Sequence, residues 1–101
     1  MKLLQDMYND NYFPNNLVDK IKDEIEKVIK FIENGNSTLE ELQNKLDEMT
    51  VAINDLEEEF EENGSELETV ARESIADTVY LVLKKYKVDI DIETAIRKRN
   101  W

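Results

Sequence analysis

The pattern that most constrains this chain is a row of apolar residues between positions 39 and 60, which we call the seam. Its members are spaced alternately three and four residues apart: Leu39, Leu42, Leu46, Met49, Ile53, Leu56 and Phe60. Such spacing, kept over three heptads, is typical of a long helix with one narrow apolar face. Ser37 and Thr38 each precede a Glu by three residues, the spacing of a capping box, so we expect the helix to begin there.

A second long helix is predicted before the seam helix, over residues 17–33. Its apolar residues follow one stripe of helical period, and Asn34-Gly35 supplies a common stop signal at its C-terminal end. Residues 2–9 predict a short amphipathic helix at the start of the chain. The stretch around Pro14 separates the two helices, because proline disfavours a helical residue before it.

A third long helix is predicted over residues 66–86. Ser65 and Glu68 have the spacing of another capping box, and residues 79–83 are apolar all round, as expected at the centre of a core. The alternative for residues 78–92 is a β-hairpin, because the first half has high β-propensity and the second half alternates.

The last residues predict a short helix that is capped by Asp89 or Asp91, and Trp101 is expected to plug the core. Two glycines and one proline are too few for a turn-rich β fold. We therefore predict a single all-α domain over residues 1–101. It is a small bundle of four to five helices built on a long antiparallel hairpin of about 38–62 and 66–86.

The missing residue types exclude several kinds of site. The chain has no Cys and no His, which excludes disulfides, thiolate and histidine metal sites, and Ser-His or Cys-His catalysis. It contains no glycine-rich phosphate-binding motif. We assign no catalytic residue, no metal ligand and no cofactor, and we favour a protein that is not an enzyme. No apolar run resembles a signal peptide or a membrane span, so we expect a cytoplasmic protein.

The formal charge of −11 is concentrated in the middle of the chain. Residues 31–83 hold fifteen acidic and only two basic residues, whereas residues 84–101 hold three acidic and six basic ones. An acidic surface repels nucleic acid and anionic membranes, so we expect neither as a partner. It favours a basic protein as partner, although good solubility alone would also account for such a charge.

Several strings along the chain resemble a family of short, acidic, functionally uncharacterised bacterial proteins. The resemblance extends over nearly the whole length and implies a bacterial origin, but it implies no reaction and no site residues. The strings are Tyr12-Phe13-Pro14, Leu17-Val18-Asp19-Lys20-Ile21, Leu46-Asp47-Glu48-Met49-Thr50, residues 63–72 and Arg97-Lys98-Arg99-Asn100-Trp101.

The acidic residues are densest where the seam helix is expected to meet the next helix. Carboxylates at the C-terminal end of a helix are unfavourable, because they lie near the negative end of its dipole. Few cations of the chain are expected within reach of this corner. It is therefore our candidate surface for a basic protein partner, as in immunity-type or inhibitor proteins. The candidate partner-binding residues are Glu57, Glu58, Glu61, Glu62, Glu66 and Glu68.

An enzymatic alternative uses the same corner. Glu58, Glu59 and Glu62 resemble the Glu-Glu-x-x-Glu motif of MazG-like all-α nucleotide pyrophosphohydrolases. The second motif of that family, Glu-x-x-Asp, is not matched, because Ala76 stands where the Asp belongs. The alternative function is thus a Mg²⁺-dependent pyrophosphohydrolase-like enzyme. Its acidic residues would be Glu58, Glu62, Glu73 and Asp77.

The seam also permits a second form of burial. A heptad seam is the usual contact surface of a coiled coil. A homodimer through the helix of residues 38–62 is therefore the alternative to burial of the seam within one bundle.

Overall fold

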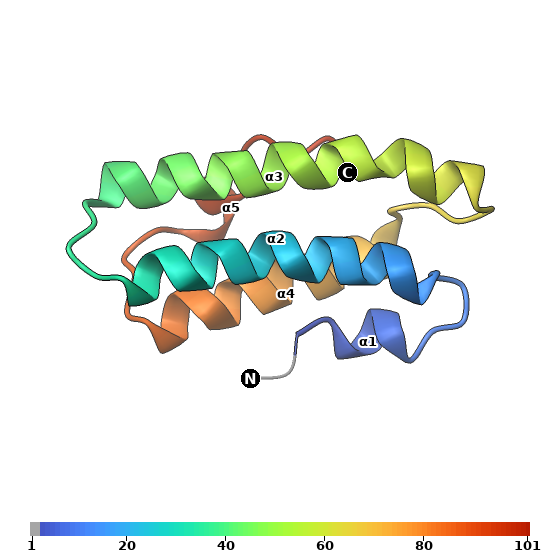
Figure 1. The fold of residues 1–101 in the computed structure, drawn as a ribbon, viewed down its shortest axis with the longest axis horizontal. Coiled ribbons are helices and arrows are strands. Elements are labelled where there is room, and N and C mark those ends of the chain that lie inside the picture. Colours follow the sequence, from blue (N-terminus) through green and yellow to red (C-terminus); the bar gives the residue numbers. More distant parts are fainter. Residues whose placement is uncertain (1–2) are drawn as a thin grey trace.

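Helices make up the regular structure of residues 3–101, the part of the chain that this computed structural model describes, and no strand occurs there (Figure 1). The prediction of an all-α bundle with four to five helices is confirmed, and the β-hairpin alternative for residues 78–92 is wrong. The elements are α1 (Gln5–Tyr8), α2 (Asn15–Glu33), α3 (Leu39–Glu62), α4 (Thr69–Lys85) and α5 (Ile92–Ala95).

The long helices α2, α3 and α4 run in alternating directions along the molecule (Figure 1). The closest packing is between α2 and α3. We expected the spine to be a hairpin of residues 38–62 and 66–86, and this is corrected: these two helices follow each other in antiparallel directions, but the closely packed hairpin is α2 with α3. Helices α3 and α4 are not the closest pair, because α5 packs against both of them.

The seam of α3 is buried within the single chain. Its inward side chains are at most 8% exposed: Leu42, Leu46, Met49, Ile53 and Phe60. Leu39 at the start of the helix is 51% exposed, and Leu56 is partly buried against the core. A homodimer through this seam stays a prediction, and a second copy would find little of the seam still accessible.

The start of α3 is fixed by the predicted capping box. Thr38 Oγ1 accepts a hydrogen bond of 3.1 Å from the backbone N–H of Glu41, whose carboxylate accepts one of 3.1 Å from the N–H of Thr38. Two otherwise unpaired donors of the first turn are thereby satisfied. With 24 residues, α3 is about 36 Å long at 1.5 Å per residue, close to the 41 Å length of the molecule.

The start of α4 differs from the prediction. The helix begins at Thr69, and its N-cap Glu68 makes no side-chain cap bond, so the expected capping box of Ser65 and Glu68 is wrong. The reason lies in how α3 ends. The N–H of Ser65 is already donated to the carbonyl of Phe60, at 2.8 Å, and Leu67 turns inward and is buried.

The other short helices lie close to their predicted positions. Asp91 caps α5, because its Oδ2 accepts a bond of 3.0 Å from the N–H of Glu93. The predicted helix of residues 2–9 corresponds to α1, although residue 2 lies outside the described residues. Leu4 has a left-handed φ of 59° just before α1, and its side chain is almost completely buried.

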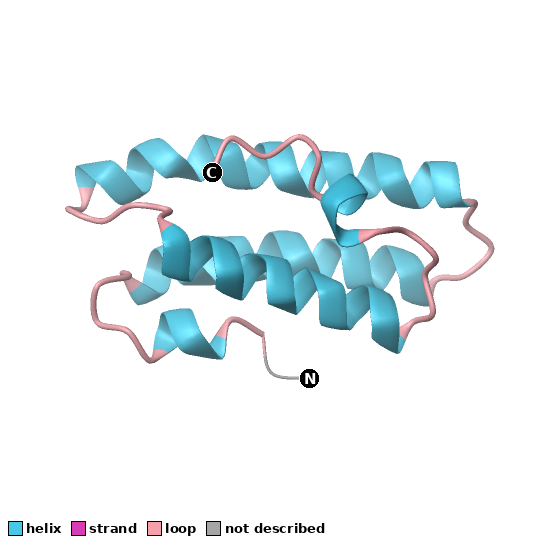
Figure 2. Cartoon of the chain, turned by 180° about the vertical axis from the view of Figure 1, so that it is seen from behind, coloured by secondary structure: helices cyan, strands magenta, loops and turns pink. Residues whose placement is uncertain are grey.

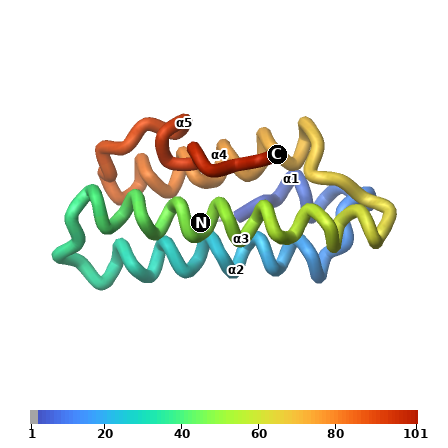
Figure 3. The backbone as a smooth tube through the Cα atoms, turned by 90° about the horizontal axis from the view of Figure 1, so that it is seen from above, coloured from blue at the N-terminus to red at the C-terminus, as the bar shows by residue number. Residues whose placement is uncertain are grey.

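Helix α5 and the irregular residues 96–101, which we call the strap, fill the space between α3 and α4 (Figures 2 and 3). Ala95, Ile96 and Trp101 are buried there, which confirms Trp101 as part of the core. Polar bonds tie the strap to α3: Asn54 donates to the Lys98 carbonyl, at 2.8 Å, and accepts from the Asn100 N–H, at 2.9 Å.

One further bond between the strap and α3 is ionic. Arg97 binds both carboxylate oxygens of Asp47, at 3.2 and 2.8 Å. Burial opposes ionisation of Asp47, but the bonds from Arg97 and Gln43 outweigh it and hold its pKa below the ordinary value. No helix within residues 3–101 has the length and apolar character needed to cross a membrane.

Two conservative truncations test the burial of the seam. Replacement Ile53→Val removes one methylene from a fully buried site and should lower the free energy of unfolding by about 0.5–1.5 kcal/mol. Replacement Leu39→Ala, at the exposed end of the same seam, should change it by less than about 0.5 kcal/mol. Urea unfolding followed by circular dichroism measures both, and equal losses would contradict the arrangement of α3.

Candidate functional site

The acidic corner, residues 57–68, joins the end of α3 to the start of α4, at the right of Figure 1. The turn itself is ordinary helix-ending chemistry. Ser65 N–H bonds to the Phe60 carbonyl at 2.8 Å, and Gly64 N–H bonds to the Glu61 carbonyl at 3.1 Å, which together form a Schellman motif. Gly64 takes the left-handed φ of 74° that this motif requires.

Six of the seven carboxylates of the corner are not paired with a described cation of the chain. Glu58, Glu61, Glu62, Glu66 and Glu68 are exposed, and Glu57 is half-buried. Among the ion pairs of residues 3–101, none includes any of these six predicted site residues. Because the negative end of the α3 dipole lies in the same place, the local charge is unfavourable for the free protein.

Two cations come near the corner but do not neutralise these residues. Lys20 of α2 lies 2.7 Å from Glu59, the one glutamate in the run that was not assigned to the site. Arg72 of α4 donates to Thr69 Oγ1 at 3.0 Å. The corner therefore keeps most of its negative charge for solvent or for a partner.

An aromatic side chain adds a second kind of surface to the corner. Tyr12, from the loop between α1 and α2, is 39% exposed, and its ring packs edge-on against buried Phe13, 5.1 Å between centroids. Phe13 in turn packs edge-on against Phe60 at the end of α3, at 6.4 Å. These two edge-on ring contacts connect Tyr12 to the end of α3 and place it beside the acidic corner.

The acidity of Tyr12 reflects the carboxylates of the corner. Its pKa is raised above the ordinary value, first by partial burial and then by the negative charges of Glu68 and Glu66. Sequence reasoning grouped Tyr12 with Tyr8 and Phe13 but did not connect it to the corner. No spacing in the sequence signals a contact between residues so far apart.

Glu57 has a perturbed acidity in the folded protein. Burial, and then the charge of Glu61 one turn later, raise the pKa of Glu57 above its ordinary value of 4.5. Its charged form is thus disfavoured in the folded protein, which is the expected effect of crowding like charges at positions i and i+4.

The enzymatic alternative is not supported by the geometry. Among residues 3–101, no group of three or more His, Cys, Asp or Glu side chains could hold a metal ion. Glu58 and Glu62 lie at the end of α3, whereas Glu73 and Asp77 lie on α4 beyond the extended residues 65–68. Because α3 and α4 do not pack closely, the four carboxylates do not form a magnesium site.

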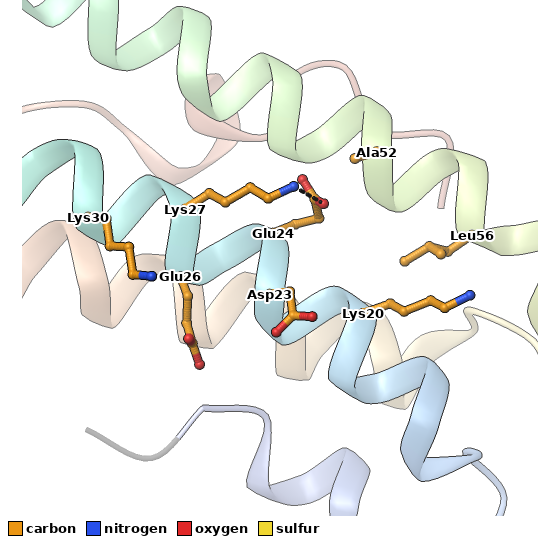
Figure 4. A pocket seen from close by; sticks show the side chains of 8 residues that line it. All are labelled: Lys20, Asp23, Glu24, Glu26, Lys27, Lys30, Ala52 and Leu56. Atoms are coloured by element: carbon orange, nitrogen blue, oxygen red, sulfur yellow. Dashed lines mark hydrogen bonds and ion pairs between the residues drawn. The ribbon is translucent and has the colours of Figure 1, made fainter.

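A groove between α2 and α3 is another hollow lined by charged residues (Figure 4). It has a volume of about 410 Å³, and its lining includes three lysines and three acidic residues. Lys27 bonds to Glu24 at 2.9 Å, and Lys20 is paired with Glu59. Since most of its cations are paired, this groove has no excess of charge to attract a ligand.

Comparison with known proteins gives one match that covers the whole chain. Residues 1–101 match a family described as "Family of unknown function (DUF5713)". The chain belongs to this family. No curated protein and no solved structure matches it. The match confirms membership of a functionally uncharacterised family over the whole length, whereas the expected bacterial origin stays a prediction. The family assigns no activity, so any functional argument rests on the residues described above.

A pair of substitutions on α3 tests the electrostatics of the corner. Glu57→Gln should raise the free energy of unfolding at neutral pH by about 0.3 kcal/mol, because it removes a disfavoured charge near the negative end of the helix dipole. Glu40→Gln, in the first turn of α3, should lower it by a similar few tenths, about 0.3 kcal/mol, because a carboxylate is favourable there.

The effect of Glu57→Gln should depend on pH. Since the folded-state pKa of Glu57 is raised above 4.5, its destabilising effect grows as pH rises through that value and is absent below about pH 4. Chemical denaturation at neutral and acidic pH measures the difference. A stabilisation that persists unchanged in acid would contradict this explanation.

Proposed function

We propose that this protein is a non-enzymatic binding protein whose acidic corner docks a basic protein partner. The observation that supports the proposal most directly is the set of carboxylates that lack a described cation: Glu57, Glu58, Glu61, Glu62, Glu66 and Glu68. Burying these charges against a cationic surface would relieve repulsion that the free protein retains.

Tyr12 gives the corner a way to recognise the shape of a cation as well as its charge. A lysine or arginine of the partner over this exposed ring would gain a cation–π contact, worth about 0.5–1 kcal/mol at an exposed site. The negative charges of Glu66 and Glu68 act on the Tyr12 hydroxyl and would attract the same cationic group. Complementary charge of this kind mainly speeds association and selects the partner.

The rigid support of the corner favours binding without rearrangement. Phe60 and Leu67, on either side of the turn, are buried, and the Schellman motif fixes the backbone between them. A preorganised surface loses little conformational entropy on binding. Genes adjacent to the one that encodes this chain would show whether a basic protein, such as a toxin, is encoded beside it.

Affinity capture followed by a purified binding assay tests the assignment of the corner. A basic partner captured by the native protein should bind at least about tenfold more weakly to a variant with Glu58, Glu61, Glu66 and Glu68 replaced by Gln. Calorimetry with the purified pair should also show weaker binding when the salt is raised from about 0.05 to 0.3 M.

The matched control removes four charges elsewhere. Replacement of Glu40, Asp55, Glu73 and Asp77 by the corresponding amides gives the same net charge without changing the corner. This control should keep nearly the native affinity. Equal losses in the two variants would mean that net charge, and not the corner, attracts the partner, and no loss in either would refute the proposal.

Tyr12 can be tested with the same partner. Tyr12→Phe keeps the ring and should bind nearly as well as the native protein, whereas Tyr12→Ala should weaken binding by about 0.5–1 kcal/mol. The two variants differ in the ring that a partner cation would contact. If both bind alike, the ring makes no contact with the cation, and the corner acts through its carboxylates alone.

A further inference from the structure

The end of α4 carries an exposed surface of the opposite charge, which we call the basic end: Tyr80, Leu81, Lys84, Lys85 and Lys87. Tyr80 is 48% exposed and Leu81 is 51% exposed. They lie just before the last turn of the helix, at the opposite end of α4 from the acidic corner (Figure 1). Residues 79–83 were expected to be buried all round at the centre of the core, and this expectation is wrong for these two side chains.

The lysines of the basic end do not pair with the chain's own carboxylates. Acidic residues outnumber basic ones by 24 to 13, yet the ion pairs within residues 3–101 include neither Lys84, Lys85 nor Lys87. Instead, Lys84 lies over the ring of Tyr80, 5.9 Å from its centroid, and Lys85 lies over the ring of Tyr86, at 5.4 Å. Their charges remain available to a partner.

An apolar cleft lies beside Lys84, between the last turn of α4 and residues 88–92. It has a volume of about 240 Å³, and its apolar walls come from Leu83, Val88, Ile90 and Ile92. Tyr80 and Lys84 form its edge. Asp91 also lines it, but its Oδ2 already accepts the bond that caps α5.

The backbone conformation at Lys87 is one that favours glycine over lysine. Lys87 has a left-handed φ of 55°, and the Val88 N–H bonds to the Leu83 carbonyl at 2.9 Å, as in a Schellman motif. Glycine is the residue that takes this conformation without steric cost. The chain thus places a lysine where glycine would be more stable, next to two other lysines without carboxylate partners.

We propose that the basic end is a docking site for a segment of another protein with a large apolar side chain flanked by Asp or Glu residues. The apolar side chain enters the cleft, and the flanking carboxylates pair with Lys84, Lys85 and Lys87. The cleft is smaller than most small-molecule sites, which are about 300–1,000 Å³, and suits a single side chain.

The proposal is independent of the acidic corner, because the two surfaces are at opposite ends of a molecule 41 Å long. Electrostatic interactions are screened over about 8 Å at physiological salt, so each end attracts its own partner. An acidic segment is favoured over nucleic acid because the apolar walls of the cleft offer nothing to a phosphate backbone.

Selection from a phage library of random short peptides, with the intact protein as bait, tests this inference. Peptides that combine an aromatic or aliphatic residue with flanking Asp or Glu should be enriched. Their affinity for a variant with Lys84, Lys85 and Lys87 replaced by Gln should fall about tenfold or more. Tyr80→Ser, at a residue that lines the cleft, should weaken binding without changing the charge.

Lys87→Gly serves as a second variant that keeps the fold intact. It should unfold no more easily than the native protein, because glycine accepts the local backbone, yet it should bind the selected peptides more weakly. Two control variants should keep full affinity. One has Lys20, Lys22 and Lys27 replaced by Gln, and the other is the corner variant with Glu58, Glu61, Glu66 and Glu68 replaced by Gln.

Several results would overturn the proposal. These are enrichment of basic peptides, equal binding to all variants, or no enrichment at all. Self-association that is lost with the same three lysines would make a second copy the occupant instead. Flotation with phosphatidylcholine–phosphatidylglycerol vesicles that depends on these lysines would replace the protein segment with a membrane surface.

Discussion

Burial of the narrow apolar face of α3 is the constraint on which the other elements depend. Several elements cover it. Helix α2 packs closely against one side, and α5 and the strap pack between α3 and α4 on the other. The last ten residues therefore complete the core, and α4 can lie at a distance from α3 without leaving a gap.

The charged residues at the helix ends agree with the helix dipoles at some ends and oppose them at others. Glu40 and Glu41 at the start of α3 and Lys84 and Lys85 at the end of α4 complement the dipoles of their helices. The glutamates at the end of α3 do the opposite, because they lie near the negative end of the α3 dipole. A local arrangement that costs stability, next to an exposed aromatic ring and on a rigid turn, is where a binding surface is expected.

The sequence predicted the fold where the physics is local. The heptad spacing identified α3, and the capping box placed its first residue, because both depend on neighbours within one or two turns. The start of α4 was misplaced because Ser65, which looked like an N-cap, serves the end of α3 instead. The closeness of α2 and α3 and the position of Tyr12 depend on contacts across the bundle, which no local spacing encodes.

The two surfaces differ in how far the sequence alone reveals them. The acidic corner is contiguous in sequence, so its charge density is visible in residues 57–68 alone. The basic end combines exposed residues of α4 with a cleft that exists only because residues 88–92 fold back beside the helix. The two proposed partners would occupy opposite ends of a molecule 41 Å long, so neither would have to displace the other.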